Sequence, residues 1–434
     1  IITINLLEGK LGAIRIEDEG KPLRVDRGFI NETMTARQKP GDPLNLDDLE
    51  RSNSLLNDIP GLAVATVLSP GDGPGESDAI VKAQDQALMT GTVLADNSGS
   101  RSTGAARLSF NGTLDNPRGK GDQATANVNI SEGNAFFRMG YSLPVGRDGM
   151  RLGASISHLD YELVGSDFSA LNAEGDAQTF SLTANYPFLR KGNRNINLAS
   201  SLDYKLFDNE ANGQSTSEKQ IYKLLLAVTG DQLDSLGEGG MTLWGGNLTL
   251  GDLDLSDNAA NQAADRAGPN TQGSYQKLGA NVARLQRLNS QTTFWASLNL
   301  QYAFGNLDSS EQISLGGPSG VRAYPVLEGS GDQGGYLSIE ARHNFDTTLQ
   351  GLVFYDLGHI KLRHDNDFSG ALSPDSGTLK GYGLGLSWNR PGQFSVRGII
   401  AQRHGKNPFR NANGKDTDGS LKRPRFWLSA SAFF

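Results

Sequence analysis

The sequence predicts a mostly β protein: a 16-stranded antiparallel transmembrane β-barrel preceded by a small α+β domain with the element order β-α-α-β-β. Three observations lead to this fold class. Long segments alternate apolar and polar residues, and short turns alternate with long polar loops. No apolar run approaches the roughly 18 residues that a transmembrane helix needs. We expect the small domain to span residues 1–82 and the barrel to span residues 83–434.

The composition excludes several classes of protein. The 434 residues include no Cys, which excludes disulfides and thiolate metal sites. The formal charge of −8 argues against a nucleic-acid partner, because phosphate binding needs a basic surface. A soluble all-β protein and a membrane β-barrel are both compatible with the composition. Ile1 begins directly in an alternating segment without a signal peptide, so we expect a mature or truncated chain.

The first 82 residues mix strand and helix patterns. Residues 2–6 and 13–17 alternate apolar and polar side chains, as strands do. A helix is expected after its N-cap Asn45, with Asp47 and Asp48 in its first turn. Pro60-Gly61 ends this helix, and two further strands are predicted at 62–69 and 78–84. The predicted buried face of the helix consists of Leu46, Leu49, Leu56 and Ile59.

From about Leu88 the chain changes to long alternating strands. In one of them Phe180 and Leu182 face one way, while Ser181 and Thr183 face the other. Many of these segments reach ten residues, whereas strands of soluble proteins usually have about 5–6. An apolar face opposite a face of small or polar residues is typical of a wall between lipid and a wet lumen. The strands therefore favour the membrane barrel over the soluble alternative.

The connections support the same interpretation. Tight joints are predicted at 144–149, 190–195, 237–240, 288–291, 344–348 and 389–393, and long polar loops at 165–177, 208–218, 255–273, 305–334, 364–377 and 405–423. The short joint Glu132-Gly133-Asn134 is expected on the long-loop side as an exception. The last strand, 426–434, stops on Phe434, which we interpret as a signal for the barrel-assembly machinery; a place in an aromatic girdle would equally indicate a membrane.

Motifs of catalysis are missing from the sequence. It contains no P-loop, no H-E-x-x-H and no G-x-S-x-G, and Gly381-Tyr382-Gly383-Leu384-Gly385 lies inside a predicted strand. His359 and His364 lie near Asp365 and Asp367, but their spacing matches no known calcium loop, so we interpret them as solvated loop residues. We therefore expect no catalytic residue, no cofactor, no metal site and no nucleotide hydrolysis.

Two motifs point to a family. The loop 305–334 contains Val321-Arg322-Ala323-Tyr324-Pro325, and a later strand contains Phe354-Tyr355-Asp356-Leu357-Gly358. They resemble the V-R-G-Y/F loop motif and the F-x-D-x-G strand motif of the Omp85 superfamily. The Val-Arg-Ala-Tyr-Pro variant, in a chain with one small domain ahead of about sixteen strands, resembles the TpsB transporters of two-partner secretion. The resemblance covers nearly the whole chain, and Ala323 departs from the commoner Gly.

The resemblance implies a function and partners. Residues 1–82 would be a periplasmic polypeptide-transport-associated (POTRA) domain that binds a secreted TpsA-type protein. The barrel would be a monomer among outer-membrane lipids, inserted by the barrel-assembly machinery. Because the family usually carries two POTRA domains and an N-terminal plug helix, we expect this chain to be a shortened form with only the second domain. The cargo, whether adhesin, haemolysin, contact-dependent toxin or haemophore, is left open.

The resemblance also implies a site inside the barrel. Phe354, Asp356 and Gly358 share one face of their strand, so Asp356 is expected to point into the lumen. The family pattern pairs the loop residue Arg322 with this Asp, and the planar guanidinium suits a two-point contact with a carboxylate. We expect Glu340 and Arg342, which share a face of the preceding strand, to extend the network.

Two other functions stay open at this stage. An insertase of the barrel-assembly type shares both motifs but normally carries more periplasmic domains. A passive porin or surface adhesin would not need the pair of motifs. The sequence favours a pore that exports a partner protein, which would thread the lumen unfolded and fold outside.

Overall fold

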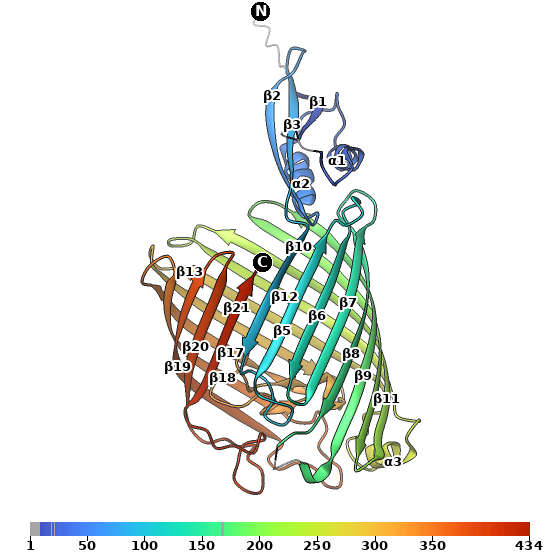
Figure 1. The fold of residues 1–434 in the computed structure, drawn as a ribbon, viewed down its shortest axis with the longest axis vertical. Coiled ribbons are helices and arrows are strands. Elements are labelled where there is room, and N and C mark those ends of the chain that lie inside the picture. The colour runs from blue at the N-terminus through green and yellow to red at the C-terminus, as the bar shows by residue number, and fades with distance from the viewer. Residues whose placement is uncertain (1–8, 19, 21, 166–168) are drawn as a thin grey trace, which may run out of the picture.

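The computed structural model describes residues 9–18, 20, 22–165 and 169–434. Figure 1 shows a small N-terminal unit of strands and helices seated on one rim of a large barrel. Sixteen antiparallel strands close the barrel, which confirms the predicted fold class. Among the described residues, no helix is both long enough and apolar enough to cross a membrane.

The N-terminal unit has its elements in the order β-α-α-β-β. They are β1 Lys10–Glu17, α1 Arg27–Met34, α2 Leu46–Asn57, β2 Leu62–Pro70 and β3 Glu76–Asp85. The sheet order is β1-β3-β2, with β1 parallel and β2 antiparallel to the central β3. The two helices pack on the sheet around a core that includes Ile30, Met34, Leu56 and Val81. The strand predicted at 2–6 lies outside the described residues.

The barrel begins directly after this unit. Its strands are β4 Met89–Asp96, β5 Arg107–Asp115, β6 Gln123–Ser131, β7 Asn134–Pro144, β8 Arg151–Glu162, β9 Ala173–Arg190, β10 Arg194–Ala211, β11 Gln214–Asp234, β12 Gly240–Asp254, β13 Gly273–Arg287, β14 Thr292–Ala303, β17 Gln333–Asn344, β18 Leu349–Lys361, β19 Ser376–Arg390, β20 Phe394–Arg403 and β21 Arg425–Phe433. β21 pairs with β4 and closes the ring. Leu182, Leu202, Leu384 and Leu428 are among the exposed apolar side chains of these strands, as expected for a lipid-facing surface.

The two rims of the barrel differ in their connections (Figure 1). The rim next to the N-terminal unit has short turns, and the opposite rim carries the long loops and helix α3 Ala259–Ala267. The turn at Gly133 belongs to the long-loop rim as predicted, because its N–H donates to the carbonyl of Thr103 in a loop of that rim.

One predicted long loop, 208–218, is wrong. β10 and β11 continue pairing to Ala211 and Gln214, so only Asn212 and Gly213 form the turn. Both residues have positive φ angles, 52° and 71°, which Asn-Gly adopts readily in a tight hairpin. The polar composition of this segment reflects a hairpin that extends toward water. The loop predicted at 165–177 is also shorter, because β9 starts at Ala173.

Helix α2 forms the main contact of the N-terminal unit with the barrel rim. Its N-cap is Asn45, whose side chain accepts a hydrogen bond from the Asp47 N–H, as predicted. Leu49 and Leu56 are buried, but the prediction for Leu46 is wrong because this side chain is 62% exposed. Arg51 is buried instead, since a second face of α2 rests on the barrel rim.

Arg51 is the centre of this contact. Its guanidinium donates to the carbonyl of Pro187 at 2.8 Å and to the carboxylate of Asp148 at 3.1 Å. Asp148 lies in the turn between β7 and β8 and also accepts from Arg37 at 3.0 Å. Arg190 at the end of β9 pairs with Asp58 at 2.7 Å. The N-terminal unit is therefore held on one side of the barrel mouth.

Candidate functional site

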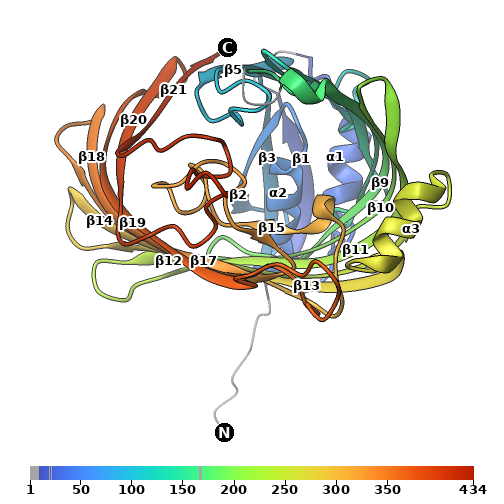
Figure 2. The same ribbon diagram turned by 90° about the horizontal axis from the view of Figure 1, so that it is seen from below.

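The connection between β14 and β17 folds back into the barrel (Figure 2, orange). We call residues 305–332 the lumen loop; the predicted loop ended at 334, but β17 begins at Gln333. The two-residue strands β15 Ile313–Ser314 and β16 Ser330–Gly331 pair at its base. Its tip packs against apolar side chains of the inner wall. The buried tip residues are Leu315, Val321, Ala323 and Tyr324, and their wall partners include Leu352, Phe354, Leu379 and Trp427.

Arg322 fixes the tip to the wall. Its Nε and Nη2 donate to the two carboxylate oxygens of Asp356 at 2.9 and 2.7 Å. Its Nη1 donates to Glu340 at 2.6 Å, and Nη2 also donates to Ser338 at 2.8 Å. The guanidinium stacks 3.5 Å from the ring centre of Phe354. The structure thus brings together the predicted loop residue and the predicted strand residues from β17 and β18.

The ions of this cluster are removed from water. The side chains of Arg322 and Asp356 are 4% and 1% exposed, and that of Glu340 is 6% exposed. Arg342 extends the network, because its Nη2 lies 2.6 Å from the other oxygen of Glu340. Buried charges are tolerated only when they are paired and hydrogen-bonded, and here each one is.

Glycines on the wall make room for the loop. A Cβ at Gly358 would lie 3.0 Å from Val321, and a Cβ at Gly381 would lie 2.6 Å from the Cβ of Ala323. Gly383 similarly accommodates the ring of Phe354. The Gly381–Gly385 segment is part of β19, so these glycines allow close approach of the loop and of neighbouring side chains.

The last strand also contacts the loop. Trp427 on β21 donates its ring N–H to the carbonyl of Arg322 at 2.7 Å. Tyr324 is fully buried, with the Arg403 guanidinium 4.5 Å from its ring centre. Pro325 is buried as well, and its carbonyl accepts from the N–H of Glu328 at 3.3 Å.

A second loop, which the sequence predicted only as one of the long polar loops, folds inward beside the first. Residues 404–424 connect β20 to β21, and Figure 2 shows them in dark red inside the ring of strands. The buried carboxylate of Asp416 pairs with Arg403 and, at 3.2 Å, with Arg425. Glu328 of the lumen loop accepts from Thr417 at 3.0 Å, which joins the two loops. One sequence feature could have indicated this inward fold: the loop is flanked by two arginines, Arg403 at the end of β20 and Arg425 at the start of β21.

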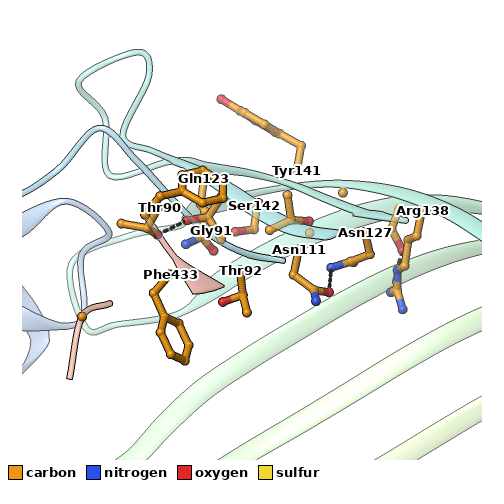
Figure 3. A pocket seen from close by; sticks show the side chains of 18 of the residues that line it. Thr90, Gly91, Thr92, Asn111, Gln123, Asn127, Arg138, Tyr141, Ser142 and Phe433 are labelled. Atoms are coloured by element: carbon orange, nitrogen blue, oxygen red, sulfur yellow. Dashed lines mark hydrogen bonds between the residues drawn. The ribbon is translucent and has the colours of Figure 1, made fainter. Parts of the chain in front are cut away.

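Two cavities lined largely by small polar residues lie along the strands from β4 to β9, and one of them borders the lumen loop. One has a volume of 1030 Å³ and is lined mainly by Thr, Ser, Asn and Gly, with Arg138 and Arg390 as its charged side chains. Figure 3 shows its polar side chains, including a hydrogen bond between Asn111 and Asn127. A second cavity of 580 Å³ shares Asn111, Asn127 and Arg138 with the first and reaches Val326 of the lumen loop.

The remaining predicted residues lie apart from this cluster. Phe434 exchanges backbone hydrogen bonds of 2.9 and 3.1 Å with Gly91 and stacks on Phe110, so it prolongs the β21–β4 pairing. The prediction that His359 is a loop residue is wrong, because His359 lies on β18 and contacts Thr378 at 2.9 Å. Within the described part of the chain, no group of three His, Cys, Asp or Glu residues has the arrangement of a metal site.

Comparison with known proteins identifies the family. Residues 75–388 match the family described as haemolysin secretion/activation protein ShlB/FhaC/HecB. The chain is 26% identical to the heme/hemopexin transporter protein HuxB of Haemophilus influenzae, over 99% of this chain and 74% of that protein. It is 27% identical to the outer membrane transporter CdiB of Dickeya dadantii, over 86% and 66% of the two chains.

A solved structure supports the fold independently. CdiB from Escherichia coli superposes with a TM-score of 0.79 at 23% sequence identity, covering 99% of this chain and 77% of that one. At this identity the likeness concerns the fold alone. Since the family match covers most of the residues, the chain belongs to the ShlB/FhaC/HecB family, the TpsB-type β-barrel transporters of the outer membrane.

Proposed function

We propose that this protein is the outer-membrane pore of a two-partner secretion system and exports a TpsA-type protein without nucleotide hydrolysis. The main supporting observation is the lumen loop, which is bound inside the barrel by non-covalent contacts centred on Arg322 and Asp356. Such contacts can open and reform as a polypeptide passes. A passive porin has no need of this arrangement, and an insertase normally has more periplasmic domains.

The polar cavities beside the loop support the same proposal. An unfolded chain that crosses the lumen needs hydrogen-bonding groups for its backbone, and it must not bind strongly to any one of them. The Thr, Ser and Asn side chains along β4–β7 meet both needs because they are polar and uncharged. The exported chain would therefore pass along β4–β9, next to the two inserted loops.

Residues 1–82 would act as a POTRA domain that captures the cargo in the periplasm. β2 is an edge strand of its sheet, bonded only to β3 among the described strands. Val67 and Leu68 on this strand are 49% and 40% exposed. An extended segment of the cargo could add to this edge, because edge strands offer free backbone groups for pairing.

The free energy for export would come from binding and from folding of the cargo outside. The sequence carries no P-loop that could couple nucleotide hydrolysis to movement. The names of the relatives mention heme/hemopexin and hemolysin, which is consistent with several kinds of exported protein. The cargo of this chain would be encoded next to it.

Secretion in a heterologous host tests the proposal. The transporter and the neighbouring candidate exoprotein are co-expressed, and the exoprotein in the medium is measured relative to folded transporter in the membrane. We expect release with the intact chain and none when residues 1–82 are removed, although the barrel still assembles. If the intact chain releases no such protein, or the barrel alone releases it normally, the proposal fails.

A further inference from the structure

The lumen loop has a second attachment, on another part of the wall. Its tip is bound to β17 and β18, whereas its first limb, residues 305–314, lies against β10, β11 and β13. Figure 2 shows the loop extending across the interior between these sections of the ring. The contact of the first limb centres on Glu311, in the short helical turn Ser309–Glu311. Neither of the sequence motifs includes this residue.

Glu311 is surrounded by lysines from three strands. Its carboxylate lies 2.7 Å from Lys205 on β10, 3.0 Å from Lys277 on β13 and 3.9 Å from Lys223 on β11. The Glu311 side chain is 3% exposed, and the three lysines are 14–17% exposed. The backbone carbonyl of Glu311 accepts further hydrogen bonds from Lys277 at 2.6 Å and from Gln301 at 3.2 Å.

The charge balance makes Glu311 decisive for this contact. Lys223 is also paired with Asp203 at 3.1 Å, so two carboxylates serve three ammonium groups. Without the Glu311 charge, Asp203 would face three lysines alone. Like charges that are shielded from water repel strongly, and this repulsion falls when the loop moves and water reaches the lysines. A neighbouring pair, Lys219 and Asp308 at 2.9 Å, ties the start of the same turn to β11.

We propose that Glu311 is a positioning residue that forms a second latch for the lumen loop, independent of the Arg322 cluster. The two latches share no residue and attach the loop to different strands. The loop leaves the lumen only when both latches have opened. A partner protein therefore has to displace Glu311 from one part of the wall and Arg322 from another. This last step rests on the proposed secretion function; the latch itself does not.

A thiol-accessibility experiment tests the latch directly. The chain has no Cys, so Ser314→Cys introduces a single thiol next to the latch, where the hydroxyl of Ser314 is buried without a hydrogen bond. The full chain is placed in lipid vesicles and labelled with a water-soluble maleimide. We expect Glu311→Gln to speed labelling roughly tenfold, because the latch no longer opposes local opening of the limb. Glu238→Gln, which removes the same charge at an exposed turn on the other rim, should leave the rate unchanged.

Two further variants keep the test decisive. Lys205→Gln with Lys277→Gln removes the closest partners while leaving Glu311 in place, and it should also speed labelling. If the two latches are independent, the effects of Glu311→Gln and Arg322→Ala on the labelling rate multiply. Heat-modifiable migration in detergent gels confirms that each barrel is folded.

The outcomes separate the latch from the transport function. Labelling of Ser314→Cys that stays slow in Glu311→Gln and in the double lysine variant overturns the latch, whatever the secretion result. Fast labelling in both variants, with no exoprotein released by the unaltered chain, supports the latch and contradicts the proposed function. If the latch and the proposed function are both correct, Glu311→Gln should also raise the conductance of single barrels in planar bilayers.

Discussion

The guanidinium of Arg322 engages both carboxylate oxygens of Asp356, at 2.9 and 2.7 Å, and this pair joins a loop to a strand 34 residues further along the chain. Both side chains are almost completely buried, so water does little to moderate the loss of one partner. Removing one member of a buried ion pair costs about 3–5 kcal/mol, because the other charge is left without compensation.

We therefore expect Arg322→Ala to release the tip of the lumen loop while the barrel still assembles. The carboxylate of Asp356 would lose its cationic partner and draw water to the wall, while Glu340 would keep Arg342; the hydrogen bonds between the strands do not depend on the loop. Exported protein per folded transporter should fall at least tenfold, a factor that corresponds to about 1.4 kcal/mol. Arg410→Ala, in the exposed part of the other inserted loop, serves as the control.

The pairing itself is measured with a double-mutant cycle. Arg322→Ala combined with Asp356→Ala should impair secretion less than the sum of the two single effects, because the double variant leaves fewer stranded charges. Strictly additive effects, or normal secretion by both single variants, would show that this pair does not hold the loop in the functional protein.

The contact between Ala323 and Gly381 gives a second prediction. An added methyl at Gly381 would lie 2.6 Å from the Cβ of Ala323, so Gly381→Ala should loosen the tip, at a cost of about 1–3 kcal/mol for overpacking. Ala323→Gly in the same chain removes the obstructing methyl and should restore secretion. Gly398→Ala places a methyl in open space on the adjacent strand and should have no effect. Failure of Ala323→Gly to rescue would mean that the two residues do not meet in this way.

The sequence predicted what depends on periodicity. Alternation along the strands gave the number of strands, and the inward face of Phe354, Asp356 and Gly358 followed from the period of two. It did not reveal the length of the β10–β11 hairpin, because polar residues beyond the membrane look like a loop even when they pair. The Asn212-Gly213 turn was the signal that would have corrected the prediction.

The inserted loops were harder to predict for a physical reason. Glu311, Asp416 and Arg403 are charged residues in polar segments, and nothing local distinguishes a charge that is solvated from one that is paired inside a barrel. Their burial depends on partners 13 to 106 residues away in the sequence. Arg51 is similar, since a charged residue on a helix is normally exposed, and its burial depends on the barrel rim.

Arg51 leads to a third prediction, on how the N-terminal unit is held. Arg51 donates to the carboxylate of Asp148 and to the carbonyl of Pro187. A hydrogen bond that involves a charged group is worth about 1.5–3 kcal/mol, so Arg51→Ala should let the unit move relative to the barrel. Spin labels on two introduced cysteines, one in each part, should report a broader distribution of distances. Lys39→Ala, at an exposed position of the same unit, should leave the distribution narrow, and an equally narrow distribution in Arg51→Ala would contradict the prediction.

The fourth prediction concerns acid. Partial burial raises the pKa of Asp148, but hydrogen bonds from Arg37, Tyr186 and Arg51 lower it by a larger amount. The net pKa is about 2, below the ordinary 3.8. Because the pKa is lower in the assembled state, the contribution of Asp148 is fully present above pH 3.8 and is lost as the pH falls toward 2. The distance distribution between the two spin labels should therefore stay narrow from pH 7 to about 4 and broaden below it.

Asp148→Asn separates this carboxylate from the others at the interface. Asp58 and Glu32 also form ion pairs with the barrel rim, so the wild-type curve contains their protonation as well. The variant should start with a broader distance distribution at pH 7, because an amide binds Arg37 and Arg51 more weakly than a carboxylate does. It should then change less than the wild type between pH 3.8 and 2. A wild-type transition centred above pH 5, or a variant with the full acid transition, would assign the pH dependence to other groups.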